Sequence, residues 1–230
     1  MTPSDSPSGP ALWAGCRRVL PAIRKHPESV VLLLHGYGSN ADDLITLAPE
    51  LADQLPGTAF ISPNAPFVCE MSAMGRQWFS LQDFTPLNRW KGVREAAPFV
   101  LQMIADLQKE FSLPLSRIAL AGFSQGGMLA LHVGPRLPEP LAAVVSFSGM
   151  LVGAEYLPAE VTARPPVLLV HGQMDPVVPF ASLPLAETAL KTCGFRVETE
   201  ICPFMPHSID EAGLQHARRF LAAALQPSGI

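Results

Sequence analysis

The feature that most constrains this chain is a serine enclosed by glycines within residues 117–133, RIALAGFSQGGMLALHV. The segment begins as a continuous apolar run typical of a buried strand, and a second apolar run of helical character follows at once. Between the two runs, GFSQG at 122–126 matches the pattern G-x-S-x-G, whose serine occupies a strained turn between a strand and a helix. Such a turn lifts the Ser124 hydroxyl above the end of a sheet. The alternative is a tight, glycine-containing connection without chemistry.

Runs typical of strands alternate with runs typical of helices along most of the chain. This order predicts an α/β fold with a mostly parallel central sheet and helices on both faces, in a single domain. We expect residues 1–10 to be a disordered tail and 11–230 to be the catalytic domain. Residues 64–90 are expected to be irregular, and Pro98 should lie in the first turn of its helix. Strands are expected at 30–35, 58–63, 117–123, 141–149, 165–172 and 195–202, and helices at 42–55, 93–111, 126–133, 184–193 and from about 208.

The composition argues against several classes of function. The formal net charge is -4, and no cluster of Lys and Arg suggests binding to nucleic acid. The longest apolar runs, such as 30–34, are too short to span a membrane, so stable membrane insertion is not expected. The chain begins without the basic and then apolar order of a secretory signal. The four cysteines lack the spacing of a zinc site, which predicts free thiols in the cytoplasm and no metal site: Cys16, Cys69, Cys193 and Cys202.

A serine hydroxyl is a poor nucleophile unless a base accepts its proton and an acid orients that base. In chains with this strand-turn-helix serine, the partners follow in the order serine, acid, histidine. Of the six histidines, only His207 lies in a loop after the last expected strand. We therefore predict that His207 is the base, and we expect the other five to be surface or packed residues.

The acid has three candidates, Asp175, Asp210 and Glu211. Asp210 is closer to His207, but Ser208 and Glu211 form the pattern of a capping box at the start of the last helix. Asp175 directly follows an expected strand and lies between the serine and the histidine in sequence. We therefore predict Asp175, the alternative being an aspartate that only forms a turn before a proline.

The oxygen of a tetrahedral intermediate needs backbone donors. Gln125 follows the serine at the start of a helix, where its amide is free to donate. The second donor should come from the loop after an early strand, where glycines at 36 and 38 let the backbone approach. We predict the Tyr37 amide as that donor.

From about residue 30 to 220, the chain resembles the acyl-protein thioesterase / phospholipase–carboxylesterase family of α/β-hydrolases. The resemblance is carried by the segments LLHGYGSN, GRQWFSL, RIALAGFSQGGMLAL, VSFSGML, LLVHGQMDPVVP and MPHSI. It implies a Ser124-Asp175-His207 triad, an oxyanion hole at the Tyr37 and Gln125 amides, no metal and no cofactor. It further implies hydrolysis of carboxylic esters, with thioesters or lysophospholipids as substrates of some members, and assembly as a homodimer. The protein-deacylating branch usually carries an LGD-type loop after the His-Gly pair, where this chain has Tyr37-Gly38-Ser39.

These observations predict a serine carboxylesterase that hydrolyses small to medium carboxylic esters through an acyl-enzyme on Ser124. One alternative is an acyl-thioesterase or lysophospholipase of the same family. Another, from a different class, is a catalytically silent hydrolase-fold module that binds a ligand. Apolar side chains in the expected loops should wall a substrate pocket for a small-molecule ester. They are Phe67, Met71, Met74, Trp78, Phe79, Met150, Leu151, Val177 and Val178.

Overall fold

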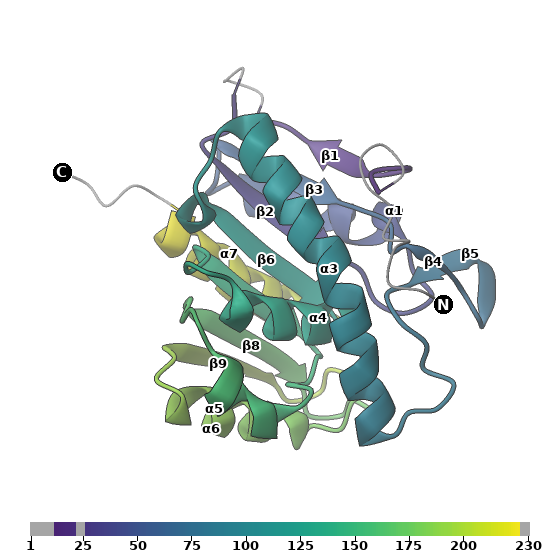
Figure 1. Ribbon diagram of the computed structural model, residues 1–230. Helices are drawn as coiled ribbons and strands as arrows, with labels where there is room; N and C mark the ends of the chain where they lie inside the picture. The colour runs from purple at the N-terminus through teal and green to yellow at the C-terminus, as the bar shows by residue number, and fades with distance from the viewer. Residues whose placement is uncertain (1–11, 22–25, 226–230) are drawn as a thin grey trace.

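A seven-stranded sheet forms the centre of the molecule, with its strands in the order β1-β3-β2-β6-β7-β8-β9 (Figure 1). Neighbouring strands run parallel except β1, which pairs antiparallel with β3 at one end of the sheet. The predicted α/β class and mostly parallel sheet are therefore confirmed. The strands are β1 (Arg17–Val19), β2 (Ser29–Leu34), β3 (Thr58–Ser62), β6 (Ile118–Phe123), β7 (Ala143–Phe147), β8 (Val167–Gly172) and β9 (Val197–Cys202).

The computed structural model describes residues 12–21 and 26–225. The tail predicted for 1–10 lies outside the described residues, as do 11, 22–25 and 226–230 of the predicted domain. The helices of the described chain are α1 (Ala41–Leu44), η2 (Ile45–Leu47), α2 (Ala48–Ala52), α3 (Pro86–Phe111), η3 (Leu115–Arg117), α4 (Gln125–Val133), η4 (Gly134–Arg136), η5 (Ala154–Tyr156), α5 (Leu157–Glu160), α6 (Ser182–Thr192) and α7 (Glu211–Leu225).

Helices cover both faces of the sheet, which explains why its central strands are buried almost throughout, namely β2, β3, β6, β7 and β8 (Figure 1). Successive side chains of β2 point to opposite faces, so Val30 and Leu32 join the core beneath α3, α4 and α6. Val31 and Leu33 join a second core with α1, α2 and α7. The sheet is thus a rigid platform buried on both sides, and its carboxyl-terminal edge carries the loops that hold the predicted site residues.

Three of the expectations for residues 64–111 are wrong. Helix α3 begins at Pro86 instead of about 93, because Thr85 caps its first turn by accepting a hydrogen bond from the Asn88 amide (3.3 Å) and proline fits a first helical position. Pro98 therefore lies inside the helix and not in its first turn. The stretch expected to be irregular also contains a two-stranded hairpin of β4 (Phe67–Cys69) and β5 (Ser72–Gln77).

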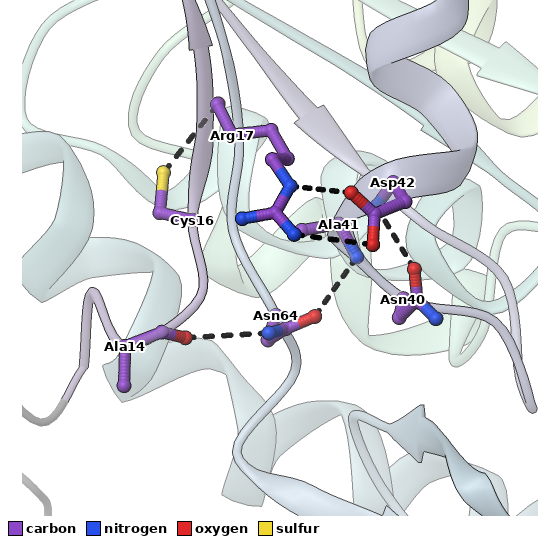
Figure 2. A network of polar contacts seen from close by, with 7 residues as sticks. All are labelled: Ala14, Cys16, Arg17, Asn40, Ala41, Asp42 and Asn64. Carbon is purple, nitrogen blue, oxygen red and sulfur yellow. Dashed lines mark hydrogen bonds and ion pairs between the residues drawn. The ribbon is translucent and has the colours of Figure 1, made fainter.

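A polar network fixes the start of α1, which follows the 36–39 loop (Figure 2). The side chain of Asn40 accepts a hydrogen bond from the Asp42 amide (2.9 Å) and caps the helix. The Asn64 side chain accepts from the Ala41 amide (2.8 Å), and Arg17 of β1 pairs with the Asp42 carboxylate. The N-terminal strand and the segment after β3 thus hold the end of the loop from two sides.

The last helix, α7, is not capped by Ser208 as the sequence pattern suggests. Its first turn is capped by Asp210, whose carboxylate accepts a hydrogen bond from the Gly213 amide (2.8 Å). The same oxygen accepts from the Cys202 thiol (3.2 Å). Asp210 therefore has a structural role, in keeping with the choice of Asp175 as the acid.

His132 on α4 provides a test of how the core responds to pH. The residue is 4% exposed, and its ring lies edge-on to Trp90 with centroids 5.3 Å apart. Burial, assisted by the charges of Arg136 and Arg94, lowers the pKa of His132 from 6.5 to about 3. Below pH 6.5 the unfolded chain therefore binds a proton that the folded protein takes up only near pH 3, so acid favours unfolding.

We expect the unfolding free energy to fall between pH 6 and 4 with a contribution of up to about 1.4 kcal/mol per pH unit from His132. His132→Leu should remove that contribution from the slope, whatever its effect on stability at neutral pH. Urea unfolding at pH 6, 5 and 4 measures both slopes. Equal slopes for the variant and the wild type would contradict the assignment.

Candidate active site

Ser124 lies at the sharp turn between β6 and α4. Its backbone has φ 52° and ψ -113°, a conformation that is strained for a residue with a side chain and costs about 1–3 kcal/mol. The strain is held in place because the Ser124 amide donates to the Phe147 carbonyl at the end of β7 (2.8 Å), while its carbonyl accepts from the Met128 amide (2.9 Å). The strand-turn-helix setting predicted for this serine is therefore present.

The two glycines of the G-x-S-x-G pattern permit a close backbone crossing. A Cβ atom on Gly122 would lie 2.3 Å from the carbonyl carbon and oxygen of Gly126. A Cβ atom on Gly126 would lie 1.9 Å from the Leu34 carbonyl oxygen at the end of β2. Side chains at either position would force α4 away from the sheet, so the glycines determine where the serine hydroxyl stands.

Asp175 and His207, which are 32 residues apart in sequence, are joined by a hydrogen bond. Nδ1 of His207 lies 2.7 Å from Oδ2 of Asp175. The other carboxylate oxygen accepts from the amides of Val177 (2.8 Å) and Val178 (2.9 Å), and the side chain of Asp175 has no exposed surface. His171 is a fourth neighbour, with Nε2 at 3.5 Å from Oδ2.

These contacts decide the charge of Asp175. Burial favours the neutral carboxyl, but the hydrogen bonds from His207 and from the Val178 and Val177 amides outweigh it and hold the pKa of Asp175 below its ordinary value. The carboxylate is therefore ionised at neutral pH. It fixes the hydrogen of His207 on Nδ1 and leaves Nε2 able to accept a proton.

The serine turn and the histidine loop meet through Phe123. Its ring lies 4.8 Å from the ring of His207, centroid to centroid. The loop after β2 reaches the same place, because a Cβ atom on Gly36 would lie 3.0 Å from the Phe123 ring and 3.5 Å from the Ser124 Cβ atom. Four loops distant in sequence, those after β2, β6, β8 and β9, therefore converge at one end of the sheet.

Two backbone amides face no competing acceptor at this point. Gln125 is the first residue of α4, where an N–H group has no acceptor within the helix. Among the described residues, the Tyr37 amide donates to no acceptor, although the next amide in the chain and the Tyr37 side chain are both hydrogen-bonded. The Gly38 amide donates to the Arg76 carbonyl (2.9 Å), and the Tyr37 hydroxyl donates to Glu70 (3.1 Å).

The predicted pocket residues fall into three groups. Trp78, Phe79 and Val178 are at most 3% exposed and belong to the core, so the structure corrects their assignment as pocket walls. All three lie outside the strands and helices, and the course of the loop turns each of them inward, which the sequence alone does not reveal. The exposed group consists of Phe67, Met71 and Met74 on the β4–β5 hairpin and of Val177 beside the acid.

Met150 and Leu151 form the third group and line a cavity of about 580 Å³ between α3, η5 and α6. A second cavity, of about 320 Å³, lies directly against His207 and Phe123. Its other walls come from residues that were not predicted to belong to the site: Asp43, Leu44, Thr46, Leu47, Ser208 and Ile209. They follow the 36–39 loop and the histidine, and that placement is the signal that could have identified them.

The described residues contain neither a cluster of metal ligands nor a membrane-spanning helix. Within 12–21 and 26–225, no three or more His, Cys, Asp and Glu side chains are grouped as metal ligands would be. None of the helices in these ranges has the length and apolar character required to cross a membrane.

Comparison with known proteins places this geometry in context. The family model described as phospholipase/carboxylesterase matches residues 14–225. The chain belongs to the phospholipase/carboxylesterase family. The resemblance found in the sequence is therefore confirmed, and membership of this family makes the protein a carboxylic ester hydrolase with the α/β-hydrolase fold.

Relatives within the phospholipase/carboxylesterase family cover most of the chain. Esterase YpfH of Escherichia coli K12 is 30% identical over 193 residues, 84% of this chain and 82% of its own. Acyl-protein thioesterase 1 of Gibberella zeae is 26% identical, covering 91% and 95% of the two chains. Esterase PE8, whose crystal structure matches this one with a TM-score of 0.87, is 41% identical in sequence, and the match covers 91% of this chain and 98% of that one. Arabidopsis thaliana SOBER1, at 22% identity and a TM-score of 0.72, shares the fold and covers 86% and 99%.

Proposed function

We propose that the protein is a serine carboxylesterase that acts on small to medium carboxylic esters through an acyl-enzyme on Ser124. The observation that carries the proposal is the 2.7 Å hydrogen bond between His207 and an ionised Asp175, beside a serine held in a strained turn. A serine, a histidine and an acid in this arrangement supply the nucleophile, the base and its orienter.

The reaction begins when His207 Nε2 accepts the Ser124 proton as the hydroxyl oxygen attacks the ester carbonyl carbon. The carbonyl oxygen becomes an oxyanion, which the amides of Tyr37 and Gln125 stabilise. His207 then donates the proton to the leaving alcohol, and the C–O bond of the ester breaks to give the acyl-enzyme. Water repeats the sequence, attacking the acyl carbon while its proton passes to His207, and releases the carboxylic acid and free Ser124.

A fluorophosphonate probe tests the nucleophile directly. Labelled protein should gain the mass of one adduct, located on the peptide that contains Ser124. Ser62→Ala is a matched control, because Ser62 is also a buried serine at the carboxyl end of a strand, but its hydroxyl has no hydrogen-bond partner among the described residues. The control should label like the wild type. Well-folded wild-type protein without an adduct would favour a silent binding module.

A panel of substrates distinguishes a carboxylesterase from the main alternative, a thioesterase or lysophospholipase. The two cavities, of about 320 and 580 Å³, are of the size that binds small molecules. We therefore expect kcat/KM for p-nitrophenyl esters to peak at short to medium acyl chains, with a lower value for a matched thioester and negligible turnover of a lysophospholipid. The thioesterase alternative is supported by the acyl-protein thioesterase relative. It would be favoured by a thioester rate above the ester rate.

We further infer a cytoplasmic location and a homodimer. All four cysteines are free and lie within the described residues, which is consistent with a reducing compartment. The family resemblance supports the dimer, and the net charge of -4 gives no reason to expect a nucleic-acid partner.

A further inference from the structure

We propose that three buried side chains, His35, Trp78 and Gln125, form one hydrogen-bonded network that holds the two oxyanion donors at a fixed separation. The inference rests on the proposed function, since it takes the Tyr37 and Gln125 amides as those donors. None of the three side chains is placed among the reacting groups in the proposed mechanism. They are therefore positioning residues. Each of them is 0% exposed.

His35 determines the direction of the Tyr37 amide. Its Nε2 accepts a hydrogen bond from the Ala65 amide (3.0 Å), so the ring hydrogen is on Nδ1, which donates to the Gly36 carbonyl (2.7 Å). That carbonyl belongs to the peptide joining residues 36 and 37. Because a trans peptide is planar, with its C=O and N–H pointing in opposite directions, fixing the carbonyl also fixes the donor.

The environment of His35 keeps the ring in the state that this role requires. Burial lowers the pKa of His35, although its hydrogen bond to Gly36 acts in the opposite sense. The ring is therefore neutral at physiological pH. A neutral ring can accept from Ala65 and donate to Gly36 at the same time, which a protonated ring cannot do.

Gln125 provides the second donor with its backbone and anchors that backbone with its side chain. Oε1 accepts from the Trp78 amide (2.9 Å), and Nε2 donates to the Phe79 carbonyl (2.8 Å). Both ends of the amide group are thus bonded to the segment that follows β5. The first residue of α4 therefore has a fixed relation to this segment, 47 residues away in sequence.

Trp78 connects the two halves of the network. Its indole Nε1 donates to the His35 carbonyl (3.0 Å), and its ring lies 5.6 Å from the His35 ring. Trp78 is therefore bonded both to His35, which lies two residues before the Tyr37 donor, and to the side chain of Gln125, whose backbone is the other donor. Buried polar groups that are all paired form rigid networks, because breaking one bond leaves an unpaired group in a dry interior.

This rigidity matters for the rate because an oxyanion hole stabilises the transition state only if its donors are aligned before the reaction. The network thus gives Trp78 a role different from the pocket wall predicted from the sequence. It also gives the side chain of Gln125 and the ring of His35 roles that the sequence analysis did not assign.

Trp78→Phe is the sharpest test, since it keeps an aromatic ring and removes the Nε1 donor, and the loss of ring volume that comes with it is the same in the control variant Trp90→Phe. Losing one direct oxyanion donor costs about 10²- to 10³-fold in kcat, and a misaligned donor should cost less, about 10- to 100-fold. We expect kcat on the best ester to fall by that factor with KM within about threefold. The inhibition constant of a trifluoromethyl ketone, whose adduct on Ser124 carries an oxyanion, should rise by a similar factor.

Trp90→Phe is the matched control, because Trp90 is another core tryptophan (7% exposed) but lies outside the network. It should lower the urea midpoint as Trp78→Phe does while kcat and ketone binding stay near the wild-type values.

A second pair of variants, at His35, separates an effect on the donor from misfolding. His35→Asn keeps a donor for the Gly36 carbonyl and should retain about tenfold more kcat than His35→Leu.

The inference is overturned if Trp78→Phe keeps wild-type kcat, or if both tryptophan variants lose activity in proportion to stability. Failure of the proposed function has a different signature, which is wild-type protein that a fluorophosphonate does not label at Ser124.

Discussion

Ser124→Ala is expected to lower kcat/KM for ester hydrolysis by about 10⁵-fold or more while the protein remains folded. Removing the nucleophile of a serine triad abolishes the covalent route and leaves only the contribution of substrate binding and the oxyanion hole. The measurement is the hydrolysis of the best p-nitrophenyl ester at saturating and low concentration, with active-site titration to exclude traces of wild-type enzyme.

The folded state of this variant should be at least as stable as the wild type, because Ser124 is mostly buried (9% exposed) and makes its hydrogen bonds through its backbone, which alanine leaves in place. Ser62→Ala again serves as the control and should retain full activity. A Ser124→Ala protein with more than about 1% of wild-type kcat/KM would show that the serine is not the nucleophile.

Asp175→Asn should reduce kcat by about 10³- to 10⁴-fold, the second largest effect that we predict. An asparagine at 175 still has an oxygen to accept from the Val177 and Val178 amides. Its NH₂ group, however, would face His207 Nδ1 and force the ring hydrogen onto Nε2. The ring could then no longer accept the Ser124 proton, although every residue would be nearly in its place.

Asp210→Asn is the matched control, since it changes the other aspartate among the candidates in the same way. The side-chain oxygen of an asparagine at 210 can still accept the hydrogen bond from the Gly213 amide at the start of α7, so activity should stay within about twofold of the wild type. The measurement is kcat for ester hydrolysis as a function of pH, compared between Asp175→Asn and Asp210→Asn. The reverse outcome, a large loss for Asp210→Asn and a small one for Asp175→Asn, would reassign the acid.

The sequence was sufficient to predict the elements whose signal is local. The runs in β2, β6 and β8 are apolar on both faces and recognisable without a structure. The serine turn is a short pattern whose glycines have a steric reason at each position. The order of serine, acid and histidine along the chain then limited the choice to a few residues, of which Asp175 and His207 are joined in the structure.

Features that depend on distant partners were not predictable in this way. Strand β1, with the sequence RRV, has no apolar run and exists because it pairs with β3 and because Arg17 binds Asp42. Trp78 and Met74 are both apolar residues of one expected loop, yet the first is fully buried and the second is 87% exposed. Only the path of the chain through the hairpin decides which of them faces the core.

The network around His35 shows the same limit. A histidine at the end of a strand and before a glycine is expected to be a packed residue, and burial alone agrees with that expectation. Its role appears only when the donors and acceptors are counted, because Ala65 and Gly36 together specify the tautomer. Sequence spacing does not contain that information.

The two outer strands of the sheet have a consequence for self-association. Strand β1 is three residues long, and β9 carries Glu198 and Glu200, which bind His216 at 3.2 and 2.7 Å. Edge strands that are short or carry charged side chains discourage a strand of a second molecule from adding to the sheet. Two copies are therefore expected to associate without extending the seven-stranded sheet from either edge.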